Sequence, residues 1–274
     1  MKDFFGYNDS FLSTKRWYRL LRWIVPLSCM VCKETDVSND APFCTECYNN
    51  FKELFFKPCI ICGNSTDNCQ CFKPQGIKEL FFLFWYDGLL SSDIISTIKY
   101  RGERRYTSYF GKLIANRIKE KSPSLKLDGV CYVPRSLNNI RKRGFDQSKL
   151  MAESVSYYLN VPLLHCIKRK GKSEEQKKLS GEERRKNVKN KFFIKLGNLI
   201  FESGEIPSNI LLIDDVITTG STIKECVYLL NKMGVRNVFV GAIAKTPLQR
   251  RKKRSYKRKK LNSSQTPDKK HNNS

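Results

Sequence analysis

Residues 209–222 read NILLIDDVITTGST, and the rest of the chain is interpreted outward from this stretch. The apolar residues 210–213 predict a buried strand, and Asp214 and Asp215 follow at its end. Residues 218–222 then open a helix, whose apolar face continues through Ile223, Cys226, Val227, Leu229 and Leu230. Small hydroxyl side chains and a glycine let backbone N–H groups surround a phosphate at a helix N-terminus, where the helix dipole also favours an anion. Because two adjacent carboxylates can accept hydrogen bonds from neighbouring hydroxyls, the stretch predicts a site for a ribose 5-phosphate.

This stretch resembles the 5-phosphoribosyl-1-pyrophosphate (PRPP) signature of type I phosphoribosyltransferases, in which a hydrophobic strand leads into Asp-Asp and then T-T/G-G-x-T. The resemblance implies that Asp214 and Asp215 lie near the ribose 2′- and 3′-hydroxyls and are catalytic. It also implies a phosphate site formed by Val216, Thr218, Thr219, Gly220, Ser221 and Thr222. Two other interpretations stay open: a receiver domain, whose acidic pair follows its first strand, and an ordinary strand–turn–helix in which Ser and Thr cap the helix.

The charge of the chain is extreme. Its 274 residues include 51 Lys and Arg against 26 Asp and Glu, a formal net charge of +25. Residues 245–274 hold 12 of those basic residues and one acid, so the remainder of the chain is basic as well. Because the tail has almost no apolar residues, we expect residues 246–274 to be disordered. Strong positive charge favours polyanionic partners such as nucleic acid through counterion release. A low-complexity extension with only non-specific nucleic-acid contacts explains the tail equally well.

Residues 1–28 contain an apolar run that basic residues interrupt and Pro26 ends. The run is too short and too charged to span a bilayer, and no small-residue cleavage site follows it. We expect an amphipathic helix that docks onto the body of the protein, with transient membrane-surface contact as an alternative use. The sequence therefore predicts no integral membrane segment and a cytoplasmic location.

Cysteine spacing is the second strong signal. Eight of the 11 cysteines form the hooks C-x2-C, C-x2-C, C-x2-C and C-x-C: Cys29, Cys32, Cys44, Cys47, Cys59, Cys62, Cys69 and Cys71. Each hook presents two thiolates to one metal, so the four hooks predict two tetrahedral sites. Zinc suits such sites, whereas a disulfide framework needs an oxidising compartment and nothing here directs export. Spacing alone does not say which hooks share an ion, and sequential pairing is the default.

The cysteine-rich segment 29–75 is too small to fold by itself, so we expect the metal to supply its stability. A closed site of four thiolates has no open position for substrate, which predicts a structural or adaptor role. The other cysteines, Cys131, Cys166 and Cys226, lie on apolar stretches and are expected in the core.

Beyond the cysteines, apolar patterns alternate between strand and helix. We expect strands at 80–85, 129–134, 162–166 and 237–244, and helices within 94–118, with a break at 101–102, and at 145–159. This alternation predicts an α/β fold with a parallel sheet. Since ligands bind at the carboxyl ends of such strands, the loop after Val133 and the loop after Asp215 are expected on one rim. The charged segment 168–191 predicts either a lid that excludes water or a solvated connector.

Several separated motifs resemble the competence protein ComF family. They are the cysteine hooks, YDGLL and IKYRGE within 86–103, VPR at 133–135, RKRGFDQS at 141–148, LSGEERRKNV at 179–188, and LLIDDVITTGST at 211–222. The resemblance covers nearly all of residues 29–244. It implies a double zinc ribbon (29–75), a type I phosphoribosyltransferase-like domain (76–245) and a link to DNA uptake in natural transformation.

The resemblance also implies roles for individual residues. The pyrophosphate loop matches Pro134, Arg135 and Ser136, with Arg135 catalytic. Candidates for contact with anions or nucleic acid are Lys99, Arg101, Arg141, Arg143 and Arg184. Asp146 stands where the family usually has Asn, which places a negative charge near the expected anion site.

Displacement of pyrophosphate from PRPP needs no protein nucleophile. It needs Mg²⁺ between the ribose hydroxyls and the pyrophosphate, and donors aimed at the leaving oxygens. Three hypotheses follow: a phosphoribosyltransferase with an unknown acceptor, an uptake factor that holds single-stranded DNA beside competence-machinery proteins, and a regulator that senses PRPP. The presence of Asp214, Asp215 and Gly220 argues against a vestigial site.

Overall fold

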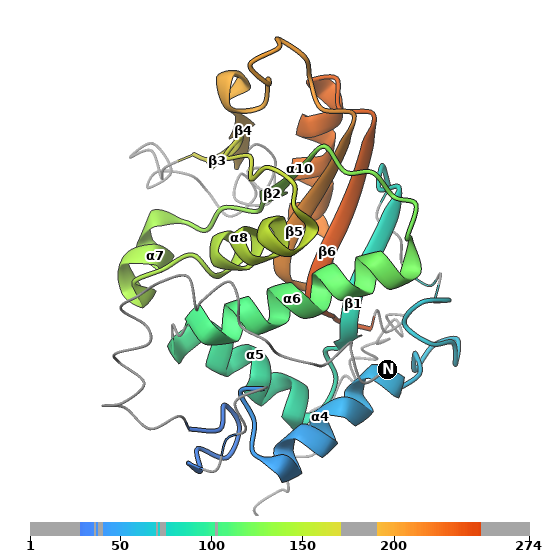
Figure 1. Ribbon diagram of the computed structural model, residues 1–274, viewed down its shortest axis with the longest axis vertical. Helices are drawn as coiled ribbons and strands as arrows, with labels where there is room; N and C mark the ends of the chain where they lie inside the picture. The colour runs from blue at the N-terminus through green and yellow to red at the C-terminus, as the bar shows by residue number, and fades with distance from the viewer. Residues whose placement is uncertain are drawn as a thin grey trace, which may run out of the picture.

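The computed structural model describes residues 28–35, 37, 41–69, 71, 75–101, 104–170 and 191–247. The predictions for residues 1–27, for most of segment 168–191 and for the tail after residue 247 lie outside the described residues. Within the described part, helices cover both faces of a central sheet, and helix α4 (Thr45–Phe56) of the cysteine-rich segment lies beside its first strand (Figure 1). No helix among the described residues has both the length and the apolar composition needed to cross a membrane.

The main sheet has four strands in the order β1–β6–β5–β2, and every neighbouring pair is parallel. The strands are β1 (Glu79–Trp85), β2 (Gly129–Tyr132), β5 (Asn209–Ile217) and β6 (Asn237–Lys245). They are almost continuous apolar runs, as strands covered on both faces require. The predicted α/β fold with a parallel sheet is therefore confirmed. Parallel strands end at one edge, so the carboxyl ends of the neighbours β5 and β2 lie together.

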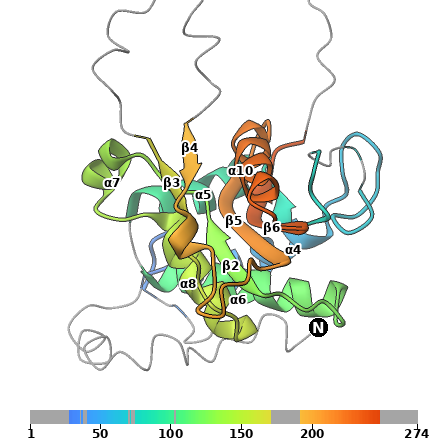
Figure 2. The ribbon, with the colours of Figure 1, turned by 90° about the horizontal axis from the view of Figure 1, so that it is seen from above.

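Two layers of helices bury the sheet (Figure 2). Helices α6 (Arg104–Lys121) and α8 (Gln147–Leu159) pack on one face, where Leu211 and Ile213 of β5 join their core. Helix α10 (Ser221–Lys232) packs on the other face against Leu212 of β5. The antiparallel strands β3 (Ile167–Arg169) and β4 (Phe192–Ile194) lie beside α10. The other described elements are α5 (Leu89–Arg101), α7 (Leu137–Arg143) and the 3-10 helix η2 (Leu196–Asn198).

The alternation of side chains is interrupted at one level of the sheet. In β5, residues 211, 213 and 216 face the α6 core, whereas residues 210, 212 and 217 face the α10 core. In β1 and β6, the consecutive residues 83–84 and 243–244 all face the α6 core. Register pairs Asp214 with Ala242 and Val216 with Ala244, so the interruption lies level with Asp215, directly after Asp214. Asp215 therefore occupies the interruption, and Asp214 borders it.

Two strand predictions were wrong in their bounds. The strand predicted to end at residue 213 continues through both aspartates to Ile217, because β6 continues to pair with it. The strand predicted at 162–166 is reduced to one bridge between Leu163 and Val130, and the next strand begins only at Ile167. Residue 163 lies beside β2, which is only four residues long and so offers little edge to pair with.

Aromatic side chains join the cysteine-rich segment to the sheet and its helices. Phe51 of α4 stacks on Phe43 with ring centroids 4.5 Å apart. The same ring meets Phe110 of α6 edge-on at 5.8 Å and Phe84 of β1 at 6.2 Å. Pairs of this kind contribute about 0.5–1.5 kcal/mol each beyond the area that they bury. The cysteine-rich segment thus shares the core of the sheet and does not fold around its cysteines alone.

Candidate functional site

The predicted ribose-phosphate residues gather at the carboxyl ends of two neighbouring strands. β5 carries Asp214 and Asp215 close to its end, and β2 leads directly into residues 133–136. Val133 still donates its backbone N–H to Ile213, at 3.0 Å, which holds the start of that loop against β5. The expectation that both loops share one rim is met by this pairing.

Asp215 is the centre of a small charge cluster. Its Oδ2 accepts a hydrogen bond from the Arg135 guanidinium, and the Lys99 ammonium lies 3.7 Å from the same oxygen. Its Oδ1 accepts the backbone N–H of Val216 at 2.8 Å. The Asp215 carboxylate is buried, and two cations from α5 and from the loop after β2 face it. Arg135, expected to contact pyrophosphate, is engaged with Asp215 here.

Asp214 has different surroundings. Its Oδ1 accepts the backbone N–H of Asp215 at 2.9 Å and the hydroxyl of Ser148 at 3.3 Å. Burial, together with the negative charge of Asp215, raises the pKa of Asp214 to about 8. The two neighbouring carboxyls thus offer unlike groups to a ligand: one is held among cations, and the other keeps its proton near neutral pH.

The phosphate loop follows β5. Gly220 adopts a left-handed conformation with φ of 70° and precedes the first residue of α10. No side chain caps this helix, although the hydroxyls of Thr219 and Ser221 lie 2.8 Å apart and the Ser221 N–H reaches Thr219 Oγ1 at 3.4 Å. Thr218 and Thr222 are exposed. Exposed hydroxyls and N–H groups at a helix N-terminus form an arrangement that suits an anion.

Asp146 is a structural acceptor at the rim. Its carboxylate accepts the backbone N–H of Arg135 at 2.9 Å and caps α8 by accepting the N–H of Lys149 at 3.2 Å. Burial raises the pKa of Asp146, whereas these N–H groups lower it. The negative charge that seemed out of place in the sequence therefore fixes the loop after β2 to the start of α8. Ser136 caps the next helix, α7, by accepting the N–H of Asn139.

The structure brings together most, but not all, of the predicted residues. Arg135, Lys99, Val216 and Asp214 each contact Asp215, and the adjoining loops carry the other predicted phosphate residues. Arg141 is exposed on α7, with no contact to the aspartates among the described residues. The side chains of Arg101 and Arg143, and all of Arg184, lie outside the described residues.

Ser148 was missed as a site residue. It follows the RGFDQ motif directly and contacts Asp214 from the first turn of α8. The only signal in the sequence was its place beside that motif. Its approach to β5 depends on how α8 packs on the sheet.

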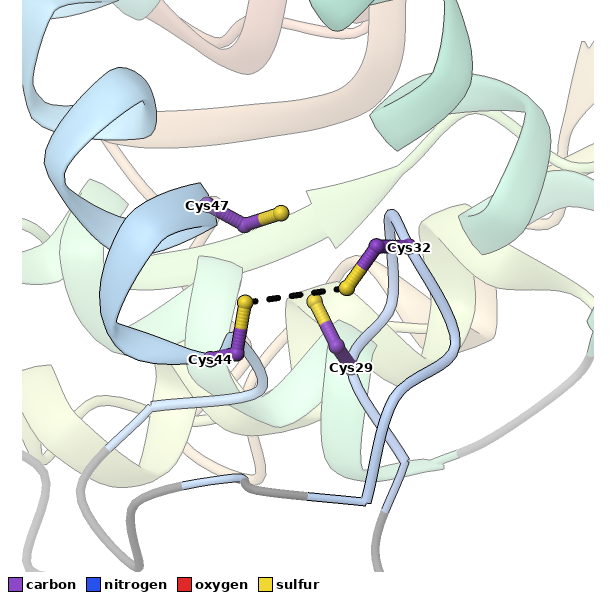
Figure 3. A group of neighbouring side chains, drawn as sticks. All are labelled: Cys29, Cys32, Cys44 and Cys47. Atoms are coloured by element: carbon purple, nitrogen blue, oxygen red, sulfur yellow. Dashed lines mark hydrogen bonds between the residues drawn. The ribbon is translucent and has the colours of Figure 1, made fainter.

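The first cysteine group combines a loop and a helix start. Cys29 and Cys32 come from a tight turn, and Cys44 and Cys47 from the N-terminus of α4, with all four sulfurs pointing toward a common centre (Figure 3). The Cys32 and Cys44 sulfurs are 3.6 Å apart, and all four lie within 4.8 Å of one another. Ligands bonded tetrahedrally to zinc at about 2.3 Å are roughly 3.8 Å apart. This donor set fits a zinc ion.

The second group consists of Cys59, Cys62, Cys69 and Cys71, whose sulfurs also lie within 4.8 Å of one another. The Cys62 and Cys69 sulfurs are 3.7 Å apart, again close to the tetrahedral spacing. Arg117 of α6 binds the intervening loop through the hydroxyl of Thr66 and, at 3.1 Å, the carboxylate of Asp67. Sequential pairing of the hooks matches this grouping, and Cys131, Cys166 and Cys226 are buried in the core as expected.

Each group contains a thiol prepared for metal binding. Burial opposes ionisation of Cys29, but the backbone N–H groups around it bring its pKa down to about 7. Cys59 has the same balance of burial and N–H groups, and a pKa of about 7. The hydrogen bond between Cys71 and Cys62 raises the pKa of Cys71 to about 12. A metal ion would displace the remaining protons, as zinc does at thiolate sites.

Curated relatives match most of the chain. The competence protein F of Haemophilus influenzae is 30% identical over 215 residues, which cover 74% of this chain and 90% of the relative. Competence protein ComFC of Streptococcus pneumoniae is 25% identical over 207 residues, covering 73% and 86%. The DNA utilization protein YhgH of Salmonella typhimurium is 26% identical over 196 residues, covering 69% and 79%. No family model matches the chain.

Solved structures similar to this chain include a glutamine PRPP amidotransferase from B. subtilis, with a TM-score of 0.38 and 17% identity over 54% of this chain and 30% of that one. Another is an adenine phosphoribosyltransferase from Leishmania donovani, with a TM-score of 0.33 and 17% identity over 56% of this chain and 57% of that one.

Proposed function

This chain belongs to the competence protein F family, and from that premise we propose that it binds PRPP, or a related sugar phosphate, with Mg²⁺ and serves DNA uptake in natural transformation. The proposed site is the rim formed by Asp214, Asp215, the loop 218–222 and the loop 134–136. Two structural zinc ions, one in each cysteine group, complete the proposal.

One observation carries the sugar-phosphate proposal. An acidic pair, two cations and an uncapped helix N-terminus meet at the ends of the neighbouring strands β2 and β5. The helix N-terminus suits the 5′-phosphate, and the acidic pair suits the ribose hydroxyls. The Arg135 Nε is buried and has no hydrogen-bond partner among the described residues, so the guanidinium is not fully engaged by Asp215.

The residues of the rim suit a displacement in which the ligand supplies the reacting groups. Mg²⁺ bound to PRPP would neutralise the pyrophosphate as it leaves. Arg135 and Lys99 would add positive charge on the same side, and Asp214 and Asp215 would orient the ribose. When a ribose hydroxyl donates a hydrogen bond to the Asp215 carboxylate, Arg135 and Lys99 can turn from this carboxylate toward the pyrophosphate.

The experiment is a calorimetric titration of the zinc-loaded protein with PRPP and Mg²⁺ at physiological salt. We expect saturable binding that Asp215→Ala and Gly220→Val abolish: the first removes the ribose acceptor, and the second places a branched side chain where φ is positive. Asp93→Ala, on the exposed surface of α5, is the matched control and should bind as the wild type does.

Unchanged PRPP affinity in both Asp215→Ala and Gly220→Val would overturn the site. If the wild type binds PRPP, candidate acceptors are then tested for transfer. If it binds only ribose 5-phosphate, the rim is a sugar-phosphate sensor and not a transferase site.

Single-stranded DNA binding is the second candidate function, and the charge of the chain favours it. The net charge is +25, and several relatives are named DNA utilization proteins. Such a protein would hold the incoming strand through phosphate contacts and pass it to other competence proteins. DNA binding that persists in Asp215→Ala would show that this function is separate from the sugar-phosphate site.

A further inference from the structure

Lys245 is a lysine in the core. It is the last residue of β6, its exposed fraction is 1%, and it is among the largest fully buried side chains of the described residues. A buried ammonium is costly unless negative groups or π-electrons compensate its charge. The groups around Lys245 therefore indicate what compensates its charge.

Two aromatic rings form one side of its environment. The Lys245 Nζ is 5.0 Å from the centre of the Trp85 ring and 5.3 Å from that of Phe82. These rings come from the neighbouring strand β1 and meet edge-on, with centroids 4.8 Å apart. Cation–π contacts hold the ammonium in place, but each is weak beside the cost of removing a charge from water.

The second cysteine group forms the other side. Cys59 is buried in the same small cluster as Phe82 and Trp85, and Cys69 packs against that cluster. Burial lowers the pKa of Lys245, and the four cysteines of this group act in the opposite direction. Burial has the largest influence on the pKa of Cys69 and, with the neighbouring thiols, raises it, whereas the positive charge of Lys245 lowers it.

A divalent zinc ion with four thiolates carries a net charge of −2. Cys62 and Cys71 are exposed to solvent, whereas Cys59 is buried beside Phe82 and Trp85, so a buried ammonium neutralises part of this charge on the side that solvent does not reach. We propose that Lys245 is the charge partner of a metal ion held by Cys59, Cys62, Cys69 and Cys71, and that it fastens this centre onto the sheet. The proposal rests on the proposed metal binding and assigns Lys245 a positioning role.

Lys245, through which we propose that the metal centre is held on the sheet, lies next to the phosphate loop. Lys245 is in register with Ile217, the last residue of β5, and the next residue, Thr246, donates its N–H to the Ile217 carbonyl at 2.8 Å. Ile217 directly precedes Thr218, where the loop begins. On the other side, the Lys245 carbonyl accepts the N–H of Tyr86 at 2.8 Å. A metal centre held by Lys245 therefore borders the strand end from which the loop departs.

The test uses the full chain loaded with ¹¹³Cd²⁺ or Zn²⁺, and compares Lys245→Met with the matched control Lys232→Met on the exposed end of α10. Wild-type protein should show two ¹¹³Cd signals, and Cys62→Ser assigns the one from the second group. In chelator competition, Lys245→Met should weaken the second site about 10- to 100-fold and leave the first unchanged, since outer partners of metal ligands have effects of this size. The first site is thus an internal control. Lys245→Arg keeps the positive charge and should restore the metal affinity of the second site.

Several outcomes would overturn the proposal. One is a metal affinity of the second site in Lys245→Met that equals that of the wild type. Another is a melting temperature lowered by the same amount with and without metal, because that is a packing effect. If Lys245→Met does not fold, Lys245→Gln takes its place. Failure of both Lys245→Met and Lys245→Gln to fold without metal also contradicts the proposal, because a charge partner of the metal is not needed when no metal is bound. A wild type that binds no metal contradicts the proposed zinc sites themselves and is distinguished by its metal content.

Discussion

Adjacent carboxylates in this chain have acquired different chemistry. Asp215 faces Arg135 and Lys99, whereas Asp214 contacts Ser148 and the backbone of its neighbour. The unlike surroundings arise where the strand alternation is interrupted, because there consecutive side chains no longer point to opposite faces in a regular way. A ligand with two neighbouring hydroxyls would meet a charged acceptor at one position and a protonated carboxyl at the other.

The raised pKa of Asp214 predicts a pH-dependent stability. Its ordinary pKa is 3.8 and its folded value about 8, so the folded state holds this proton more tightly than the unfolded state does. Between those values the free energy of unfolding falls as pH rises, and the loss is complete above about pH 8. Asp214→Asn keeps a neutral side chain at every pH and should remove this slope. Denaturant unfolding at several pH values measures it, with the surface variant Asp87→Asn as control; parallel curves for wild type and Asp214→Asn would contradict the assignment.

At the scale of elements, the rim depends on how helices begin. Asp146 caps α8 and binds the backbone of Arg135 with one carboxylate, so a single side chain sets both the helix start and the loop before it. Ser136 caps α7 in the same way. At the start of α10 no side chain caps the helix, in contrast to α7 and α8. Capped helix starts thus support the rim, and the uncapped start of α10 is the part that we propose binds phosphate.

Removing the α8 cap should be costly. Asp146→Ala is expected to lower the free energy of unfolding by about 1–2 kcal/mol, the usual effect of losing an N-cap. It should also weaken PRPP binding, since the backbone of Arg135 is then no longer anchored. Asp146→Asn retains an acceptor oxygen and should be less destabilised. Urea unfolding of both variants, beside Glu153→Ala later on the same helix, tests this; equal stability of Asp146→Ala and wild type would contradict the capping role.

At the scale of the whole molecule, charge and metal centres act together. The cysteine-rich segment is packed onto the sheet through Phe51, Arg117 and the cluster around Trp85, so metal binding there is linked to the stability of the sheet edge. The chain after residue 247 adds 11 Lys and Arg residues to a body that is already basic. The proposed nucleic-acid binding would therefore have two sources of positive charge, the body and the tail, which can be separated.

Truncation after residue 247 should reduce the salt dependence of single-stranded DNA binding. Every phosphate that the truncated chain no longer neutralises should lower the slope of log affinity against log salt by about 0.7. Fluorescence anisotropy at several salt concentrations measures this slope. A variant with residues 248–274 in shuffled order keeps the charge and should keep the slope. An unchanged slope after truncation would assign DNA binding to the body alone.

The sequence by itself determined the local chemistry of this protein. Apolar runs predicted the parallel sheet, because a strand covered on both faces needs apolar residues throughout. Short spacings predicted the metal hooks and the phosphate loop, since residues a few positions apart must lie close in space whatever the fold. Sequential pairing of the hooks was a default that spacing alone did not decide, and the shared rim of β2 and β5 followed from the rule that ligands bind at the carboxyl ends of parallel strands.

Only the tertiary structure decided which distant residues meet. It placed Lys99 and Ser148 on the aspartates, gave Asp146 a capping role, extended β5 through Asp215, and buried Lys245 between β1 and the second cysteine group. These interactions join residues far apart in the chain, and their energies depend on burial and on the packing angle of each helix. Sequence spacing contains neither quantity, and so a lysine that reads as the start of a basic tail is a core residue in the folded protein.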